Sequence, residues 1–139
     1  MDNKERELSL YRLENALSTL EIARFCMEKK HYRDSINRCY YSAFYAVKAV
    51  LALERIDFKR HKDVVGYFNK QYVATDIFSK DLGKKLGNLQ QLREKSDYND
   101  FYIASVGEAE EQMQATEYIV NNVIDYLKKE NVLESEIFC

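Results

Sequence analysis

The scarcity of turn-forming residues limits the folds that this chain can adopt. Its 139 residues include no proline and four glycines. A β-sheet protein needs turn residues at about every tenth position, so this composition favours long helices joined by short connections. The length suits one domain with a hydrophobic core. We therefore predict an all-α fold.

Apolar residues recur at three- and four-residue steps, the spacing typical of helices that bury one face. Thr75 is expected to cap one helix, and Ser105 with Glu108 matches the capping box that begins another. Residues 1–130 should form one domain, an up-and-down helical bundle of about five helices, and residues 131–139 a tail or a helix extension. The predicted helices cover about 5–29, 32–54, 62–73, 75–95 and 105–127.

The second predicted helix carries two separate stripes, so it should be central and touch more than one neighbour. One stripe is Ile36, Tyr40, Ala43, Phe44, Val47 and Leu51; the other is Arg38, Tyr41, Tyr45 and Lys48. Tyrosines at helical spacing are usually amphipathic packing residues. An arginine beside tyrosines can also hold a phosphate while a ring stacks on a base.

Several classes of protein are disfavoured. No run approaches the roughly 18 apolar residues of a membrane helix, and the polar start of the chain lacks a signal segment, so we expect a cytoplasmic protein. Three cysteines without C-x-x-C spacing argue against a disulfide framework or a zinc site; Cys26 and Cys39 are expected to be buried thiols. No phosphate loop or metal-binding motif is present, so we expect no cofactor and no metal.

Charge is unevenly distributed along the chain. Residues 24–70 hold 11 Lys and Arg against 5 Asp and Glu, whereas residues 94–139 hold 3 against 11. A basic middle is compatible with an anionic partner. Two solvated helix faces of opposite sign would give the same pattern. His61 lies in the basic cluster Lys59–Lys62 and is a candidate ligand-binding residue.

A leucine stripe at Leu82, Leu86 and Leu89 runs on to Arg93, and Asp97 follows one turn later. An arginine on a core-facing stripe loses water and must be paired, and a carboxylate four residues on is a suitable partner. The pair is either a structural ion pair at the end of the bundle or part of a cleft that faces an anionic ligand.

Three segments together resemble the HEPN domain family, in particular a single-domain prokaryotic subgroup with R-x-x-Y-Y-[AS] and R-x-x-x-D-Y segments. They are "YRDSINRCYYSAFYAVKAVL" at 32–51, "FKRHKDVVGYFNKQYV" at 58–73 and "LREKSDYND" at 92–100. The resemblance spans about residues 8–128. It implies a helical bundle that commonly forms a homodimer, that often accompanies a minimal nucleotidyltransferase and that belongs in many cases to toxin–antitoxin or defence systems.

Many proteins of this family are metal-independent ribonucleases whose signature is an arginine, four to six residues, and a histidine. By this resemblance Arg93 matches the arginine, which would stabilise phosphate charge. The histidine is absent: Tyr98 takes its place after four residues, and Asn99 or Asp100 after five or six. Unperturbed tyrosine has a pKa near 10 and transfers protons poorly at neutral pH.

Three hypotheses follow. The first is a dimeric module that binds RNA, a nucleotide or a partner protein, with Arg38, Tyr41, Arg93, Asp97, Tyr98 and His61 as candidate ligand-binding residues. The second is a metal-independent RNA endonuclease that uses Arg93 with Tyr98, or with a histidine from elsewhere such as His61. The third is an antitoxin-like structural subunit in which Arg93 and Asp97 only join helices.

Overall fold

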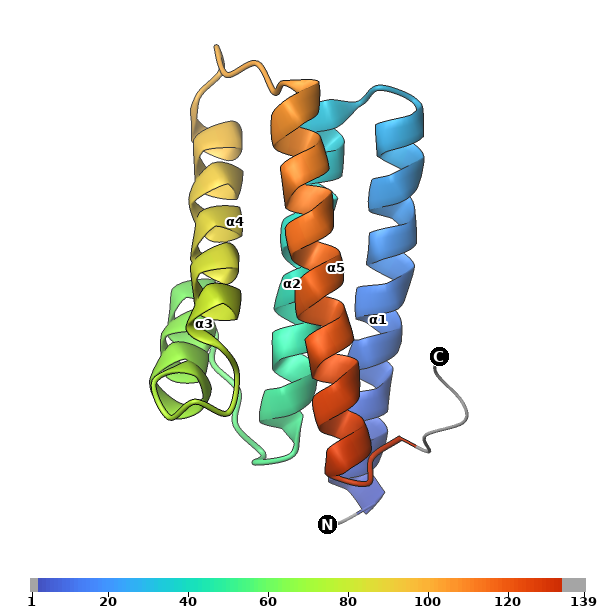
Figure 1. Ribbon diagram of the computed structural model, residues 1–139, viewed down its shortest axis with the longest axis vertical. Coiled ribbons are helices and arrows are strands. Elements are labelled where there is room, and N and C mark those ends of the chain that lie inside the picture. Colours follow the sequence, from blue (N-terminus) through green and yellow to red (C-terminus); the bar gives the residue numbers. More distant parts are fainter. Residues whose placement is uncertain (1–2, 134–139) are drawn as a thin grey trace.

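Four long helices run alternately up and down, and a short helix lies beside the fourth (Figure 1). The computed structural model describes residues 3–133, which contain helices and no strand. The all-α prediction is therefore confirmed. The helices are α1 (Asn3–Glu28), α2 (Tyr32–Ala52), α3 (His61–Phe68), α4 (Lys80–Tyr98) and α5 (Val106–Lys129), with a π-helical turn, η1 (Asn69–Val73), directly after α3.

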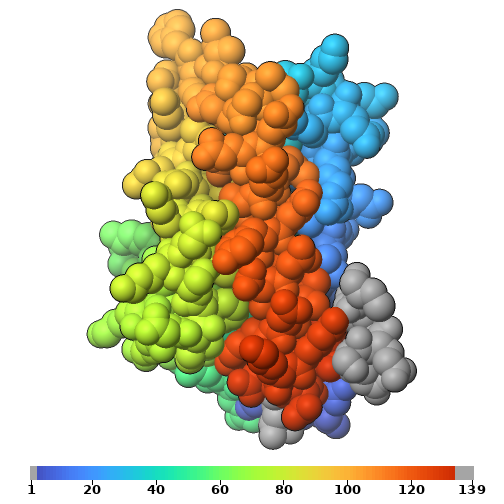
Figure 2. Space-filling view, viewed as in Figure 1, coloured from blue at the N-terminus to red at the C-terminus, as the bar shows by residue number. Residues whose placement is uncertain are grey.

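Helix α2 is the centre of the bundle, as its two stripes predict. It packs against α1, α3, α4 and α5. Its first stripe is buried, and the residues of its second stripe are half-buried at the edges of these contacts. In the space-filling view α4 and α5 form the front face (Figure 2). One hydrophobic core joins residues of every helix.

Three buried serines fasten α1 to α2. The hydroxyl of Ser9 donates to the carbonyl of Ala49 at 2.7 Å, that of Ser42 to Ala16 at 2.7 Å, and that of Ser35 to Ala23 at 2.9 Å. Each bond joins a side chain of one helix to the backbone of the other. Small residues at this contact let the helices approach closely enough for the hydroxyls to reach across.

The predicted cap of the fourth helix is wrong. Thr75 lies before the helix and its hydroxyl donates to the carbonyl of Gln71 at 2.8 Å. Helix α4 begins five residues later, where the Ser79 hydroxyl accepts from the backbone N–H of Leu82 at 3.0 Å. Asp76 adopts a positive φ of 65°, so the chain turns here and cannot continue as a right-handed helix. The capping box of Ser105 and Glu108 is confirmed.

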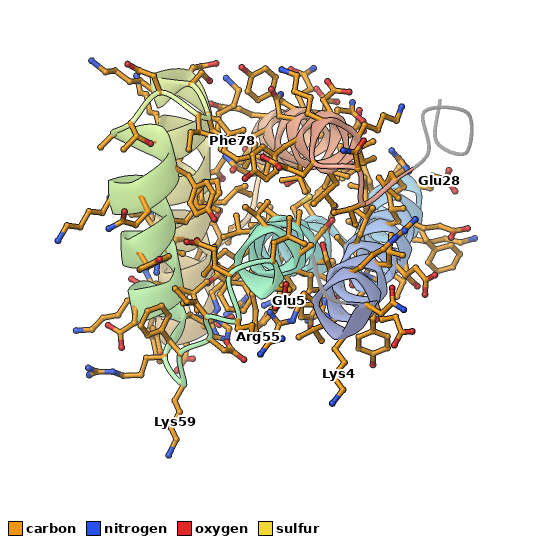
Figure 3. All side chains as sticks on the ribbon, turned by 90° about the horizontal axis from the view of Figure 1, so that it is seen from below. Lys4, Glu5, Glu28, Arg55, Lys59 and Phe78 are labelled. Atoms are coloured by element: carbon orange, nitrogen blue, oxygen red, sulfur yellow. The ribbon has the colours of Figure 1, made fainter. Side chains whose placement is uncertain are left out.

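The predicted helix over 62–73 is divided, because its last five residues form η1. Gly83 of α4 lies against this turn: a Cβ at position 83 would be 2.9 Å from Cγ1 of Val73. Gly87, which is spaced to lie on the same face, has no such neighbour. Phe78 fills the space between η1 and α5, with its ring centroid 5.2 Å from those of Phe68 and Tyr126 (Figure 3).

Helix α5 ends at Lys129, and the next residues turn back onto the core. Val132 and Leu133 are buried, and the N–H of Val132 donates to the carbonyl of Leu127 at 2.9 Å. The rest of the predicted tail, with Cys139, lies outside the described residues. Cys39 is buried as predicted, but Cys26 is half-buried. In residues 3–133 no helix is long and apolar enough to cross a bilayer.

Candidate functional site

The leucine stripe of α4 carries Arg93 toward α2. Leu82, Leu86 and Leu89 are fully buried, and the next two positions on the same face are Arg93 and Ser96. The side chain of Arg93 is 19% exposed. It therefore lies at the border of the core, where it is largely removed from water but still open on one side.

Two tyrosines of α2 surround the Arg93 guanidinium. Its Nη2 donates to the hydroxyl of Tyr41 at 3.1 Å. Its Cζ lies 5.3 Å from the ring centroid of Tyr40 and 5.5 Å from that of Tyr41, within the range of cation–π attraction. Arg93 Nε is 2.9 Å from Oδ2 of Asp97 but is not aligned for a hydrogen bond. Burial opposes the charge, yet Tyr41 and Asp97 outweigh it and raise the pKa of Arg93.

Arg38 reaches the same tyrosine from within α2. Its Cζ lies 4.9 Å from the ring centroid of Tyr41. Its Nε and Nη2 donate to the amide oxygen of Asn37 at 3.2 and 2.6 Å. No carboxylate among residues 3–133 pairs with it. Two guanidinium groups thus share one aromatic ring, and only Arg93 has a carboxylate partner.

His61, the first residue of α3, completes the cluster from a third element. Its Nδ1 shares a hydrogen bond with the hydroxyl of Tyr40 at 3.1 Å. Its ring stacks on Phe44 with centroids 4.0 Å apart and meets Tyr41 edge-on at 5.7 Å. Burial, then Arg93 and Lys48, lower the pKa of His61 below its ordinary value, so the imidazole is uncharged at neutral pH.

The structure gathers five of the six residues singled out from the sequence: Arg38, Tyr41, His61, Arg93 and Asp97. Tyr98, the last residue of α4, is 82% exposed and makes none of these contacts.

Tyr40 and Phe44 belong to the buried stripe of α2 and are not among the site residues that the sequence predicts, although Tyr40 lies beside Arg38. Tyr40 is fully buried, but its ring and hydroxyl connect Arg93 to His61. Burial, offset in part by Arg93, raises the pKa of Tyr40 to about 12. Arg33 was missed as well. Its Nε donates to the Ser96 hydroxyl at 3.1 Å and its Nη2 to the Ser96 carbonyl, which fixes the end of α4 beside α2.

This arrangement has the charge and the donors to receive an anion. Two guanidinium groups face one carboxylate, so the cluster is cationic. The uncharged imidazole beside them has a nitrogen that can accept a proton. In the part of the chain that the structure describes, no three His, Cys, Asp or Glu side chains are grouped to hold a metal ion.

Comparison with known proteins gives a consistent result. The family model described as the HEPN domain matches residues 9–130. A UPF0332 protein of Thermotoga maritima is 29% identical over 129 residues, which cover 93% of this chain and 86% of the relative. A protein of Methanocaldococcus jannaschii named as a putative toxin is 28% identical over 124 residues, 89% of this chain and 84% of the relative. A second protein of that organism with the same kind of name is 28% identical over 117 residues, 84% of each chain. The chain belongs to the HEPN domain family.

Proposed function

We propose that this protein is a toxin-type HEPN module that binds RNA through the phosphates, with Arg38, Tyr41 and Arg93 as the contact residues. The observation that carries the proposal is the pair of guanidinium groups on the Tyr41 ring, at 4.9 and 5.5 Å. Like charges held this close repel each other, and a phosphate between them would relieve the repulsion and accept their hydrogen bonds. Two relatives named as putative toxins support the biological setting.

The same proposal includes the assembly that the family implies. We expect a homodimer that brings two Arg93 clusters near each other and a partner protein, for example a minimal nucleotidyltransferase, that controls the toxin. Asp97 has a defined role in this scheme. It holds Arg93 in position, and it reduces the net positive charge so that binding requires Arg38 as well.

Binding is tested with a fluorescein-labelled single-stranded RNA and fluorescence anisotropy. Arg38→Ala should weaken binding by about tenfold or more, because a hydrogen bond to a charged group contributes ~1.5–3 kcal/mol. Its side chain loses the hydrogen bonds to the Asn37 amide and a cation–π contact with Tyr41. Such a contact contributes about 0.5–1 kcal/mol at an exposed site, so the melting temperature should fall by only a few degrees. Arg93→Lys keeps the charge but not the paired donors and should bind at an intermediate level.

Lys84→Ala is the matched control, because it removes an exposed cation from the same helix as Arg93. It should leave affinity within about twofold of wild type. Equal losses in Lys84→Ala and Arg38→Ala would show that binding depends on net charge only. No binding by wild type, together with a large loss of stability in Arg93→Ala, would favour the structural hypothesis instead.

A second candidate function, metal-independent RNA cleavage, is favoured by the place of His61. The structure puts a largely uncharged imidazole against the same two tyrosines that hold Arg93. In this reaction the imidazole removes the proton of a ribose 2′-hydroxyl, and the 2′-oxygen attacks phosphorus. The bond from phosphorus to the 5′-oxygen breaks, and the leaving 5′-oxygen takes a proton from water. Arg93 stabilises the added negative charge. Products are a 2′,3′-cyclic phosphate and a 5′-hydroxyl.

Cleavage is tested on labelled RNA with EDTA present. His61→Gln should lower the rate by about a hundredfold or more if the imidazole is the base, with binding unchanged. Tyr98→Phe should cleave as wild type does, because Tyr98 lies apart from the cluster. If Tyr98→Phe lost cleavage and His61→Gln did not, Tyr98 would be the catalytic group instead of His61. An activity that needs added divalent ions would contradict the mechanism.

A further inference from the structure

The outer face of α1 carries an exposed apolar stripe against which no other helix of the described chain packs. Four large side chains on it are well exposed: Leu8 at 40%, Tyr11 at 61%, Ile22 at 48% and Phe25 at 57%. With Asn15 and Ser18 between them, the stripe advances in steps of three, four, three, four and three residues. Steps of this kind keep side chains on one line of a helix that pairs with another helix. The stripe is about 26 Å long at 1.5 Å per residue.

A row of glutamates follows the same helix along one side of the stripe. Glu7, Glu14, Glu21 and Glu28 are spaced seven residues apart, and all four are exposed. None of them forms an ion pair with a described residue. Arg24 is one turn from Glu21 and Glu28, but its Nη2 lies 3.7 Å from Glu117 of α5. Lys29 follows Glu28 directly, and its Nζ lies 5.6 Å from the ring centroid of Phe25. The row is therefore a line of negative charge that has no ion-pair partner among residues 3–133.

This face is separate from the Arg93 cluster. Helices α1 and α4 lie on opposite edges of the bundle (Figure 1), and α1 packs only against α2 and α5 among the elements with extensive contacts. At the two ends of the stripe the surface is hollowed. One hollow, of about 520 Å³, includes Phe25 with Glu21 and Glu28. The other, also of about 520 Å³, includes Leu8, and both acidic and basic side chains line it: Glu5, Asp57, Lys4, Arg12 and Arg55. Side chains of a docked helix would have room in both.

The glutamate row decides between the possible occupants. RNA and an anionic membrane would both be repelled by it. The chain's own last residues, "ESEIFC", bring two more carboxylates and no cation. A second copy paired through this stripe would be related by two-fold symmetry. In an antiparallel pair the row would face its own copy. In a parallel pair it would face Arg12, which is 13% exposed and already bonded to Asp57.

We propose that the α1 stripe is a docking surface for an amphipathic helix of a partner protein, with Lys or Arg along the flank that meets Glu7, Glu14, Glu21 and Glu28. The partner helix spans about 18 residues to cover the stripe. Its apolar side chains pack on Tyr11, Ile22 and Phe25, and its cations select the orientation. This proposal does not depend on RNA binding, because the two faces share no residue.

The test uses two labelled 21-residue peptides with leucine at alternating three- and four-residue steps. One has lysine at the flanking positions and the other has glutamate, so that neither pairs with itself. Fluorescence anisotropy at 50 mM salt should show the lysine peptide binding about tenfold more tightly than the glutamate peptide. In Glu14→Lys/Glu21→Lys, which leaves two glutamates and two lysines in the row, the preference should disappear. In Tyr11→Ser/Ile22→Ser both peptides should bind about tenfold more weakly.

The control is Glu110→Lys/Asp125→Lys, which makes the same change in net charge on exposed positions of α5. Its preference should equal that of wild type. An equal shift in this control and in Glu14→Lys/Glu21→Lys would overturn the proposal, as would a wild-type protein that binds neither peptide. Self-association in sedimentation equilibrium that Ile22→Ser abolishes would assign the face to a second copy, and binding to anionic vesicles through Tyr11 and Ile22 would assign it to a membrane. Either result would also overturn the proposal.

Discussion

His61 is kept uncharged by its position, since no carboxylate among residues 3–133 contacts it. The groups that face it are the Tyr40 hydroxyl, the Phe44 and Tyr41 rings, and the cations Arg93 and Lys48. Burial and the two cations all disfavour a proton on the ring, which lowers the pKa of His61. The lowered pKa that would make His61 a base near neutral pH also links the protonation of His61 to the stability of the fold.

The lowered pKa of His61 predicts how the free energy of unfolding depends on pH. An unfolded chain binds the proton near pH 6.5, whereas folded His61 binds it at lower pH. The unfolded state therefore holds more protons in this window, and the free energy of unfolding should fall as the pH drops from about 7 toward 5. Above about pH 7 the contribution is fully present. His61→Gln should flatten this part of the pH dependence in urea unfolding at pH 5.5 and 7.5.

His31 offers the matched control, because it is the other histidine of the chain and is exposed at the start of α2. His31→Gln should keep the wild-type difference between the two pH values. A difference that persists in His61→Gln would show that other groups cause it, and the assignment of an uncharged, buried imidazole would then be wrong.

At the scale of elements, the sequence predicted the helices well because their signals are local. Apolar spacing placed all the long helices, and the capping box at Ser105 marked the start of α5 correctly. The cap at Thr75 failed because threonine is an equally good cap and turn residue by composition. Its hydroxyl bonds back to Gln71, and the positive φ of Asp76 separates η1 from α4. No pattern in the sequence predicts a positive φ at Asp76.

The candidate site was predictable only in part, because sequence spacing shows which residues lie close on one helix but not which helices meet. Arg93 and Asp97 lie on one helix, so their spacing already paired them, and Arg38 and Tyr41 are likewise one turn apart on α2. The link between the two helices depends on packing, in which the leucine stripe of α4 directs Arg93 onto Tyr41. His61 comes from a third element after a loop, and only the folded structure brings it to Tyr40 and Phe44.

At the scale of the whole molecule, α2 lies between the Arg93 cluster on one side of the bundle and helix α1 on the other. One face of α2 holds the tyrosines of the Arg93 cluster. Another exchanges serine hydrogen bonds with α1, because Ser9 of α1 donates to Ala49 and Ser42 of α2 donates to Ala16. One core includes side chains from all five helices. A domain of this size with one core usually unfolds in a single cooperative step. A substitution that weakens the contact of α1 with α2 should therefore also destabilise the contact of α4 with α2.

Ser42→Ala tests this connection. It removes the bond from the buried Ser42 hydroxyl to the Ala16 carbonyl and should lower the free energy of unfolding by about 1 kcal/mol. Ser18→Ala, on the exposed side of α1, should change it by less than about 0.5 kcal/mol. Unfolding is followed by far-ultraviolet circular dichroism for the helices and by near-ultraviolet dichroism, to which Tyr40 and Tyr41 contribute. In Ser42→Ala both signals should shift together to lower urea. If the tyrosine signal kept its wild-type midpoint while the helix signal moved, α1 would unfold separately and α2 would not transmit its loss to the Arg93 cluster.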